Sequence, residues 1–293
     1  MPEADEYLLT NVGFSLQEAP YISLQQADTF SDLLPLQKTL TLRFDSTQRF
    51  CVGWRDITKG ERFACPDHTE IDSKYEQCSD CQQRTGFNPA FYYASSISTQ
   101  QEARNLEPHT LYLAHFGPGI IKVGISYTAR ERSRLLEQGA RSALILDAFP
   151  TAHIARQYEA RIAALPHIVE TIQLRKKIAT LAKEYDAKVA RRELHEMRTS
   201  IQTALNVTFT KNDPMVLDPV YFPGVQPVFG DAYDTTDQHL ISGSVIGMLG
   251  SLLFCTQHEG ILFLPLKKYV GYKLTLTYEE TLVTLPARQT SLF

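Results

Sequence analysis

The sequence has no apolar run approaching the roughly 18 residues that a membrane span requires, so we expect no membrane partner. Glycine and proline are not enriched, at 15 each among 293 residues, which excludes collagen-like, low-complexity and largely disordered chains. A strong excess of charge is also missing, because 29 Lys and Arg stand against 33 Asp and Glu. The formal net charge of −4 excludes a uniformly basic coat for nucleic acid but allows a local basic face.

The amino-terminal residues MPEADEYLL lack the basic start and the apolar stretch of a secretory signal. We therefore expect a cytoplasmic protein. Its length and its 43% of hydrophobic residues allow a sizeable core and about two domains.

The five cysteines are concentrated in one short segment. Four of them are Cys51, Cys65, Cys78 and Cys81, and the last two form a C-x2-C pair. In a cytoplasmic chain, such a group is more typical of metal ligands than of disulfides. A C-x2-C turn directs two thiolates at one tetrahedral ion, and the other two cysteines would complete a closed, structural Zn²⁺ site. A set in which His68 replaces Cys51 is the alternative, because Cys65 and His68 have the same spacing.

Hydrophobic periodicity predicts a regular series of elements after the cysteine segment. A Gly-Pro-Gly turn separates two apolar runs and predicts a β-hairpin, and Thr128 and Gly139 are the expected N-cap and C-cap of the next helix. In chain order we expect a strand at 39–44, the hairpin at 110–116 and 120–126, a helix at 128–139, a strand at 142–149 and a helix that stops before Pro166.

Residues 167–205 contain no Gly or Pro, and their apolar positions recur every three to five residues. This pattern predicts a long basic amphipathic helix, or two helices in series. Eight Lys and Arg stand against four acids between Arg175 and Arg198. They form either a solvated face or a surface that contacts phosphate groups, and the candidate nucleic-acid-binding residues there are Lys176, Lys177, Arg191 and Arg192.

The remaining chain, from Asn206, has short apolar runs punctuated by Gly and Pro, which predict four or five strands in a small barrel-like domain. The fold class is therefore α+β. We expect four regions: an amino-terminal β region with the zinc site at 1–105, a core at 106–166, the basic helix at 167–205 and the β tail at 206–293. The amino-terminal strands could pack with the tail, which would make the core an insertion.

Residues able to act on a phosphate ester gather around the predicted hairpin. Tyr112 and Lys122 lie on its two strands, Arg130 and Arg134 share one face of the next helix, and Glu159 lies midway along the second helix. An arginine stabilises the charge that develops on phosphate, and a glutamate can hold a divalent cation. A tyrosine or lysine can position or deprotonate the attacking water.

The string TLYLAHFGPGIIKVGIS, followed by an arginine-bearing helix and a glutamate-bearing helix, resembles the GIY-YIG nuclease superfamily. The resemblance implies a small three-stranded antiparallel sheet flanked by helices. It implies that TLY at 110–112 and KVG at 122–124 are the two tyrosine motifs, and that Glu159 binds a metal. Arg134 would be the helix arginine, with Arg130 and Arg132 as alternatives.

The four-cysteine segment ending in QCSDC and the Gly-rich tail resemble one bacterial branch of this superfamily, a domain of unknown function. This resemblance covers roughly residues 45–165 well and the tail loosely.

Two motif positions depart from the superfamily pattern. Thr110 replaces a glycine, and Lys122 stands where a tyrosine is expected, so Lys122 or Tyr127 would have to act as the general base. We expect a metal-dependent phosphodiesterase or endonuclease acting on DNA or RNA, with catalytic Mg²⁺ or Mn²⁺ held by Glu159. The alternatives are a nucleic-acid-binding module that has lost cleavage, and a zinc-stabilised scaffold or ligand-binding protein.

Overall fold

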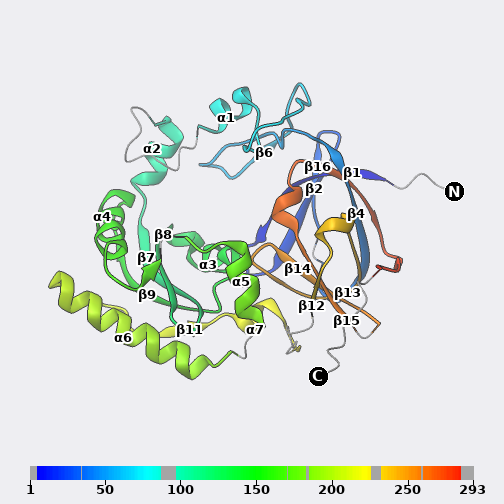
Figure 1. Cartoon of the computed structure of the whole chain (residues 1–293). Coiled ribbons are helices and arrows are strands. Elements are labelled where there is room, and N and C mark those ends of the chain that lie inside the picture. The colour runs from blue at the N-terminus through cyan, green and yellow to red at the C-terminus, as the bar shows by residue number, and fades with distance from the viewer. Residues whose placement is uncertain are drawn as a thin grey trace, which may run out of the picture.

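The computed structural model describes residues 5–33, 35–86, 97–169, 171–182, 185–225, 232–258 and 260–284. Within these ranges the chain forms a nine-stranded sheet, a five-stranded sheet and a two-stranded ribbon. The two larger sheets lie side by side in Figure 1, with three helices between them: α3 (Glu131–Gln138), α5 (Leu174–Leu181) and α7 (Asp218–Tyr221). The predicted α+β class is therefore confirmed.

The nine-stranded sheet combines strands from both ends of the chain. Its order is β12-β15-β14-β13-β4-β16-β1-β2-β3, and neighbours are antiparallel except for β12 and β15. The strands are β1 (Glu6–Phe14), β2 (Pro20–Gln26), β3 (Thr29–Leu33), β4 (Thr39–Arg49), β12 (Ala232–Asp234), β13 (Leu240–Leu249), β14 (Leu252–Gln257), β15 (Gly260–Pro265) and β16 (Tyr272–Thr277).

Within the described residues, the tail strands do not form a barrel by themselves. Strand β4, which contains the predicted strand at 39–44, lies between β13 and β16 and pairs with both. Its backbone groups therefore pair with tail strands on both sides, so β13 and β16 are joined through a strand from the amino-terminal part of the chain.

The five-stranded sheet contains the predicted hairpin and has the order β10-β8-β7-β9-β11. Its strands are β7 (His109–Gly117), β8 (Ile120–Tyr127), β9 (Ser142–Phe149), β10 (Ile168–Val169) and β11 (Pro214–Val216). The hairpin and the third strand are confirmed, but the expected three-stranded sheet has five strands. Two short segments from further along the chain pair with the outer edges of β8 and β9, edges that would otherwise leave backbone groups unpaired.

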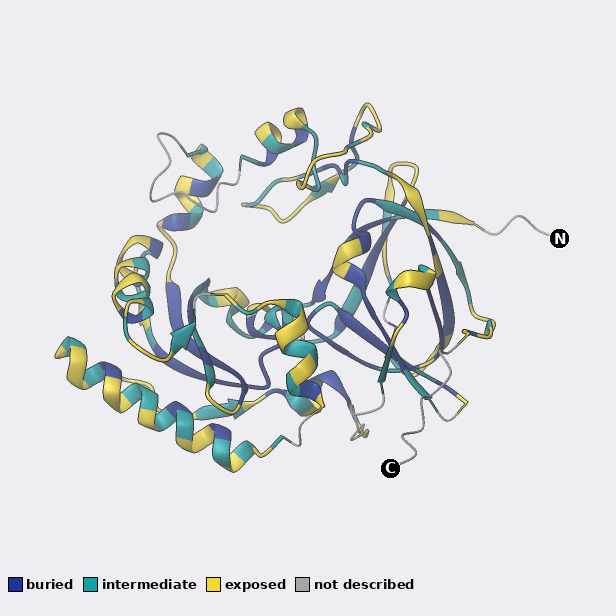
Figure 2. Ribbon diagram, in the orientation of Figure 1, coloured by how far each residue is buried: buried dark blue, intermediate teal, exposed yellow. Residues whose placement is uncertain are grey.

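Helices cover both faces of the five-stranded sheet. One face carries Leu111, Val123 and Leu144 and packs against α4 (Ala152–Ala163) and α6 (Ala187–Leu205). Helices α3 and α5 lie on the opposite face, whose side chains join the core of the nine-stranded sheet. In Figure 2 the strands are buried between these layers, and the outer side of α6 is exposed.

The segment 167–205 forms two helices in series rather than one long helix. Helix α5 ends at Leu181, and α6 follows Asp186, whose carboxylate accepts hydrogen bonds from two backbone N–H groups of the first turn. The break has a packing reason, because Leu181 of α5 and Leu194 of α6 are buried on opposite faces of the sheet. Residues 183–184 lie outside the described residues.

The remaining elements are short: β5 (Trp54–Arg55), β6 (Arg62–Phe63), α1 (Ser79–Thr85), α2 (Thr99–Asn105), and the 3-10 turns η1 (Thr128–Arg130), η3 (Thr236–Gln238) and η4 (Leu266–Tyr269). The predicted C-cap Gly139 is confirmed, with a left-handed φ of 73°. The predicted N-cap Thr128 is wrong, because its hydroxyl donates to the Pro108 carbonyl and Arg130 precedes α3 instead. None of the described helices has both the length and the apolar character needed to cross a membrane.

Candidate functional site

Four cysteine side chains meet beside the amino-terminal strands. The Sγ atoms of Cys51, Cys65, Cys78 and Cys81 all lie within 4.8 Å of one another, and those of Cys65 and Cys78 are 4.0 Å apart. Four sulfurs held tetrahedrally at about 2.3 Å from one zinc ion would be separated by about 3.8 Å. All four cysteines are free thiols, so the cluster has the donors and nearly the dimensions of a four-sulfur metal site.

The thiols of this cluster differ in pKa. Burial raises the pKa of Cys51 to about 11, although the Cys78 backbone N–H donates a hydrogen bond to its sulfur at 3.2 Å. Burial acts in the same direction at Cys65, but hydrogen bonds with Thr69, the Asp67 backbone and Cys51 together outweigh it and lower the Cys65 pKa to about 7. The alternative ligand His68 is exposed and outside the group of four, so the four-cysteine assignment is favoured.

A second cluster lies on the face of the five-stranded sheet that is turned toward α3 and α5; we call it the Tyr112 cluster. Tyr112 pairs across the hairpin with Gly124, and Ala114 with Lys122, so these side chains share one face. Tyr112 is only 1% exposed, and a Cβ at Gly124 would lie 2.6 Å from its hydroxyl oxygen. Glycine is therefore needed at 124 to make room for the tyrosine ring.

Helices α3 and α5 cover the tyrosine. Gln138 Nε2 at the end of α3 donates a hydrogen bond to the Tyr112 hydroxyl at 2.5 Å. Lys177 Nζ on α5 donates to the backbone carbonyl of Gln138 at 2.6 Å and lies 5.3 Å from the centre of the Phe116 ring. Lys177, which we expected on a basic helix surface, thus reaches the face of the hairpin.

Glu159 joins the Tyr112 cluster from α4. Its side chain is 15% exposed, and its carboxylate forms an ion pair with Arg156, one turn earlier on the same helix. Burial raises the pKa of Glu159, while Arg156, Lys122 and a hydrogen bond from the Ile125 backbone act in the opposite direction. The attraction between Lys122 and Glu159 links α4 to the hairpin face.

Arg134 supplies a half-exposed cation to the cluster. Its side chain is 50% exposed, and its guanidinium lies 3.6 Å from Glu137, whose carboxylate also accepts a hydrogen bond from Arg130 at 2.5 Å. Burial lowers the pKa of Lys122 and lowers that of Lys177 to about 8, and the charge of Arg134 adds to both effects. Three cations from β8, α3 and α5 therefore repel one another across this face. Burial raises the pKa of Tyr112, so its hydroxyl stays protonated near neutral pH.

The other candidate residues lie outside this arrangement. Lys176, Arg191 and Arg192 are exposed, and the two arginines belong to α6, which covers the opposite face of the sheet. Tyr127, the alternative base, has the Arg104 guanidinium over its ring, with the guanidinium carbon 4.2 Å from the ring centre. Because side chains alternate along β8, Tyr127 points to the face opposite that of Lys122.

Two members of the cluster carried no functional prediction. Gln138 directly precedes the expected C-cap Gly139, and it follows Arg134 by four residues and so shares its helix face. Arg156 precedes Glu159 by three residues, a spacing that already favours an ion pair. The contact of Lys177 with α3 has no signal in the sequence, because it joins two separate elements.

No curated protein and no solved structure is similar enough to this chain to count as a match. One family model, described as a protein of unknown function, matches residues 38–274. This range contains the cysteine cluster, the Tyr112 cluster and most strands of both sheets. The chain therefore belongs to the DUF2797 family.

Proposed function

We propose that the Tyr112 cluster binds phosphate groups of a nucleic acid. The observation that supports this most directly is the convergence of Lys122, Arg134 and Lys177 from three different elements. Among the described residues, the basic side chains in or beside the cluster outnumber the acidic ones; they are Lys122, Arg130, Arg134, Arg156 and Lys177, against Glu137 and Glu159.

A phosphate would relieve the repulsion between these cations. Arginine and lysine both donate strong, charge-assisted hydrogen bonds to phosphate oxygens, and half-exposed Arg134 offers an approach from solvent. Tyr112 is buried and holds Gln138 in place, so its role would be to fix α3 rather than to meet the ligand. Phosphate binding of this kind needs no general base.

A second candidate is metal-dependent hydrolysis of the bound phosphodiester. The resemblance to GIY-YIG nucleases and the strand-strand-helix-strand-helix order from β7 to α4 support it. Lys177 would be neutral part of the time near pH 8 and could accept a proton in place of the missing motif tyrosine. Glu159 would hold Mg²⁺ or Mn²⁺, but only by giving up its ion pair with Arg156.

We also propose that the metal of the four-cysteine site is Zn²⁺ in a structural role. Four sulfur donors leave no open position for a substrate. The segment around them is rich in polar residues and has little core of its own, so the metal would stabilise its fold.

Binding can be tested by fluorescence anisotropy with labelled single-stranded and duplex DNA and RNA at several salt concentrations. Replacing Arg134 or Lys177 by glutamine should weaken binding. It should also make the plot of the logarithm of the association constant against the logarithm of the salt concentration less steep, by about 1 for each phosphate that the variant no longer neutralises. Arg43→Gln, an exposed change on β4, serves as the control. Absence of salt-dependent binding to the wild-type protein, or unchanged slopes in both variants, would refute the proposal.

Two further arms separate the alternatives. Arg191→Gln combined with Arg192→Gln tests whether α6 also contacts phosphates. Incubation with Mg²⁺ or Mn²⁺ tests cleavage, and Glu159→Gln should abolish it while binding persists. Binding without cleavage in the wild type would reject hydrolysis and leave the binding function.

A further inference from the structure

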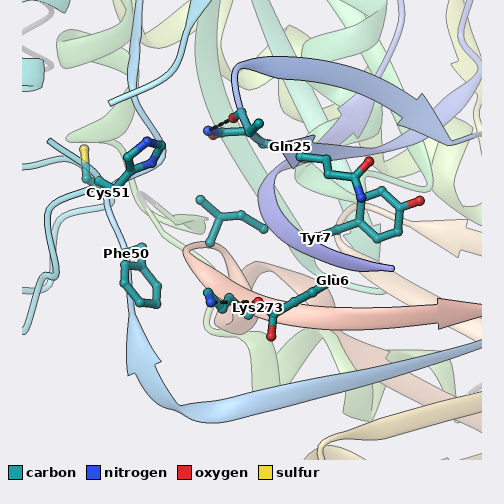
Figure 3. A pocket seen from close by; sticks show the side chains of 10 residues that line it. Glu6, Tyr7, Gln25, Phe50, Cys51 and Lys273 are labelled. Atoms are coloured by element: carbon teal, nitrogen blue, oxygen red, sulfur yellow. Dashed lines mark hydrogen bonds and ion pairs between the residues drawn. The ribbon is translucent and has the colours of Figure 1, made fainter. Parts of the chain in front are cut away.

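Lys177 of α5 is partly buried, and none of the ion pairs among the described residues includes it. Its Nζ donates a hydrogen bond to the backbone carbonyl of Gln138 and lies 5.3 Å from the centre of the Phe116 ring. By contrast, Lys273, which lines the cavity shown in Figure 3, pairs with Glu6 at 2.7 Å. The charge of Lys177 therefore lacks the carboxylate that a partly buried lysine ordinarily needs.

The charged groups that act on Lys177 are both positive. They are Lys122 of β8 and Arg134 of α3. Glu159 attracts Lys122, and Glu137 lies 3.6 Å from the Arg134 guanidinium, so these two carboxylates compensate the neighbouring cations rather than Lys177. The Gln138 carbonyl accepts a hydrogen bond but carries no full charge. The end of the Lys177 side chain is therefore a position that favours an anion.

The same surroundings make the amine a nucleophile. Burial and the two cations lower the pKa of Lys177 to about 8, so about half of it is neutral at pH 8. An exposed lysine with an ordinary pKa is only about 0.4% neutral at that pH. A neutral amine carries a lone pair that attacks an electrophilic carbon, and adjacent cations favour this form. Carbon dioxide is a small, uncharged electrophile that can reach a partly buried nitrogen, and its product with an amine is an anion.

We propose that Lys177 Nζ reacts reversibly with CO₂ to form a carbamate. The nitrogen lone pair forms the new bond to the carbon, one C–O π pair moves onto oxygen, and the nitrogen releases one proton to solvent. The neutral amine and CO₂ thus give a carbamate anion and a proton, without any oxidant or reductant. The carbamate nitrogen keeps one hydrogen for the Gln138 carbonyl, and its charge would be attracted by Lys122 and Arg134.

Carbon-13 NMR of the full chain with labelled CO₂ and bicarbonate tests the proposal. At a constant concentration of dissolved CO₂, a carbamate resonance should gain intensity from pH 7 to pH 9, because the neutral amine becomes more abundant. Triethyloxonium converts carbamates into stable ethyl esters, and peptide mass spectrometry then locates the modified lysine without any substitution. A short peptide with a free α-amino group, whose pKa is about 7.7–8.0, serves as the positive control. Absence of the ester at Lys177 while the peptide is modified would overturn the proposal.

Matched variants test the position and the role of the cations. Lys177→Gln should lose the signal, whereas Lys176→Gln, an exposed change on the same helix, should keep it. Arg134→Gln should lower the fraction of carbamate by about two- to fivefold, because it removes an attracting charge and makes the neutral amine rarer. Thermal unfolding checks that each variant is folded. Equal modification of Lys176 and Lys177, or an unchanged carbamate fraction in Arg134→Gln, would contradict the proposal.

A carbamate at Lys177 would also oppose phosphate binding at the Tyr112 cluster, because it replaces a cation by an anion. This consequence rests on the proposed function, whereas the carbamate itself does not. In fluorescence anisotropy at equal pH and ionic strength, CO₂ should weaken nucleic-acid binding by the wild type but not by Lys177→Gln. Equal weakening of both proteins would contradict this consequence. A carbamate at Lys177 in a protein that binds no nucleic acid would refute the phosphate proposal alone, and the reverse pattern would refute the carbamate alone.

Discussion

Replacing Lys177 by methionine tests the charge repulsion within the Tyr112 cluster. Burial and the charges of Lys122 and Arg134 lower the Lys177 pKa to about 8 from an ordinary value of 10.5. A difference of about 2.5 pKa units means that the charged form costs the folded state about 3 kcal/mol. Methionine keeps the contact with Phe116 but loses the hydrogen bond to the Gln138 carbonyl, worth about 1 kcal/mol. We therefore expect Lys177→Met to be more stable than the wild type by about 2 kcal/mol at pH 7.

The advantage of this variant should disappear as the pH rises. The folded wild type releases the Lys177 proton near pH 8, whereas the unfolded chain keeps it until about pH 10.5. The unfolded state binds more protons between these values, so the free energy of unfolding of the wild type rises with pH in this window. Lys177→Met lacks this contribution, and its excess stability should shrink steadily from pH 8 upward.

Urea unfolding at pH 7, 8, 9 and 10 would measure the effect. Lys176→Met, an exposed neighbour on α5, is the matched control and should follow the wild type at every pH. Cysteines and tyrosines also titrate in this range, but they are common to all three proteins and cancel in the differences. A stability difference that does not change with pH, or a less stable Lys177→Met at pH 7, would refute the proposed repulsion.

Three further predictions concern packing, the metal site and a buried ion pair. Gly124→Ala should lower the free energy of unfolding by about 1–3 kcal/mol, because its methyl group would lie 2.6 Å from the Tyr112 hydroxyl oxygen. Adding Tyr112→Leu should return part of that loss in urea unfolding, and full additivity would contradict the contact. Metal analysis should find one zinc per chain that Cys78→Ser loses together with thermal stability, while Cys255→Ala keeps the metal; an unchanged metal content in Cys78→Ser would reject the site. Arg141→Met should cost about 3–5 kcal/mol, because the side chain is 8% exposed and pairs with Asp218 at 2.5 Å. A loss below about 1 kcal/mol in urea unfolding would place this pair among ordinary surface ion pairs.

The hairpin region and the cysteine cluster could be predicted because their signals are local. Two apolar runs around Gly-Pro-Gly specify β7 and β8, Gly139 ends α3 in a left-handed conformation, and Pro166 follows α4 closely. The register of the hairpin then places Tyr112, Gly124 and Lys122 on one face. Four cysteines, which are typical metal ligands, in one short polar segment similarly predict one shared metal site.

The other features depend on contacts between distant segments, for which no local pattern exists. The alternation in TLTLRF predicts a strand at β4 but not its position between β13 and β16. Strands β10 and β11 are too short to stand out in the sequence. The division of 167–205 after Leu181 is not marked by a glycine or proline, because it follows from packing on two faces of a sheet.

The Tyr112 cluster depends on both sheets, and this limits what the resemblance to a small nuclease fold can explain. Arg134 and Gln138 lie on α3, whose end is held by a 2.7 Å hydrogen bond from Tyr221 to the Ala140 carbonyl. Arg132 ties the same helix to Glu18 in the turn after β1. Residues 106–166 alone would keep Tyr112, Lys122 and Glu159 but would lack these supports and Lys177. The proposed phosphate site therefore depends on Lys177 of α5 and on contacts of α3 with other parts of the chain, and not on the hairpin and its helices alone.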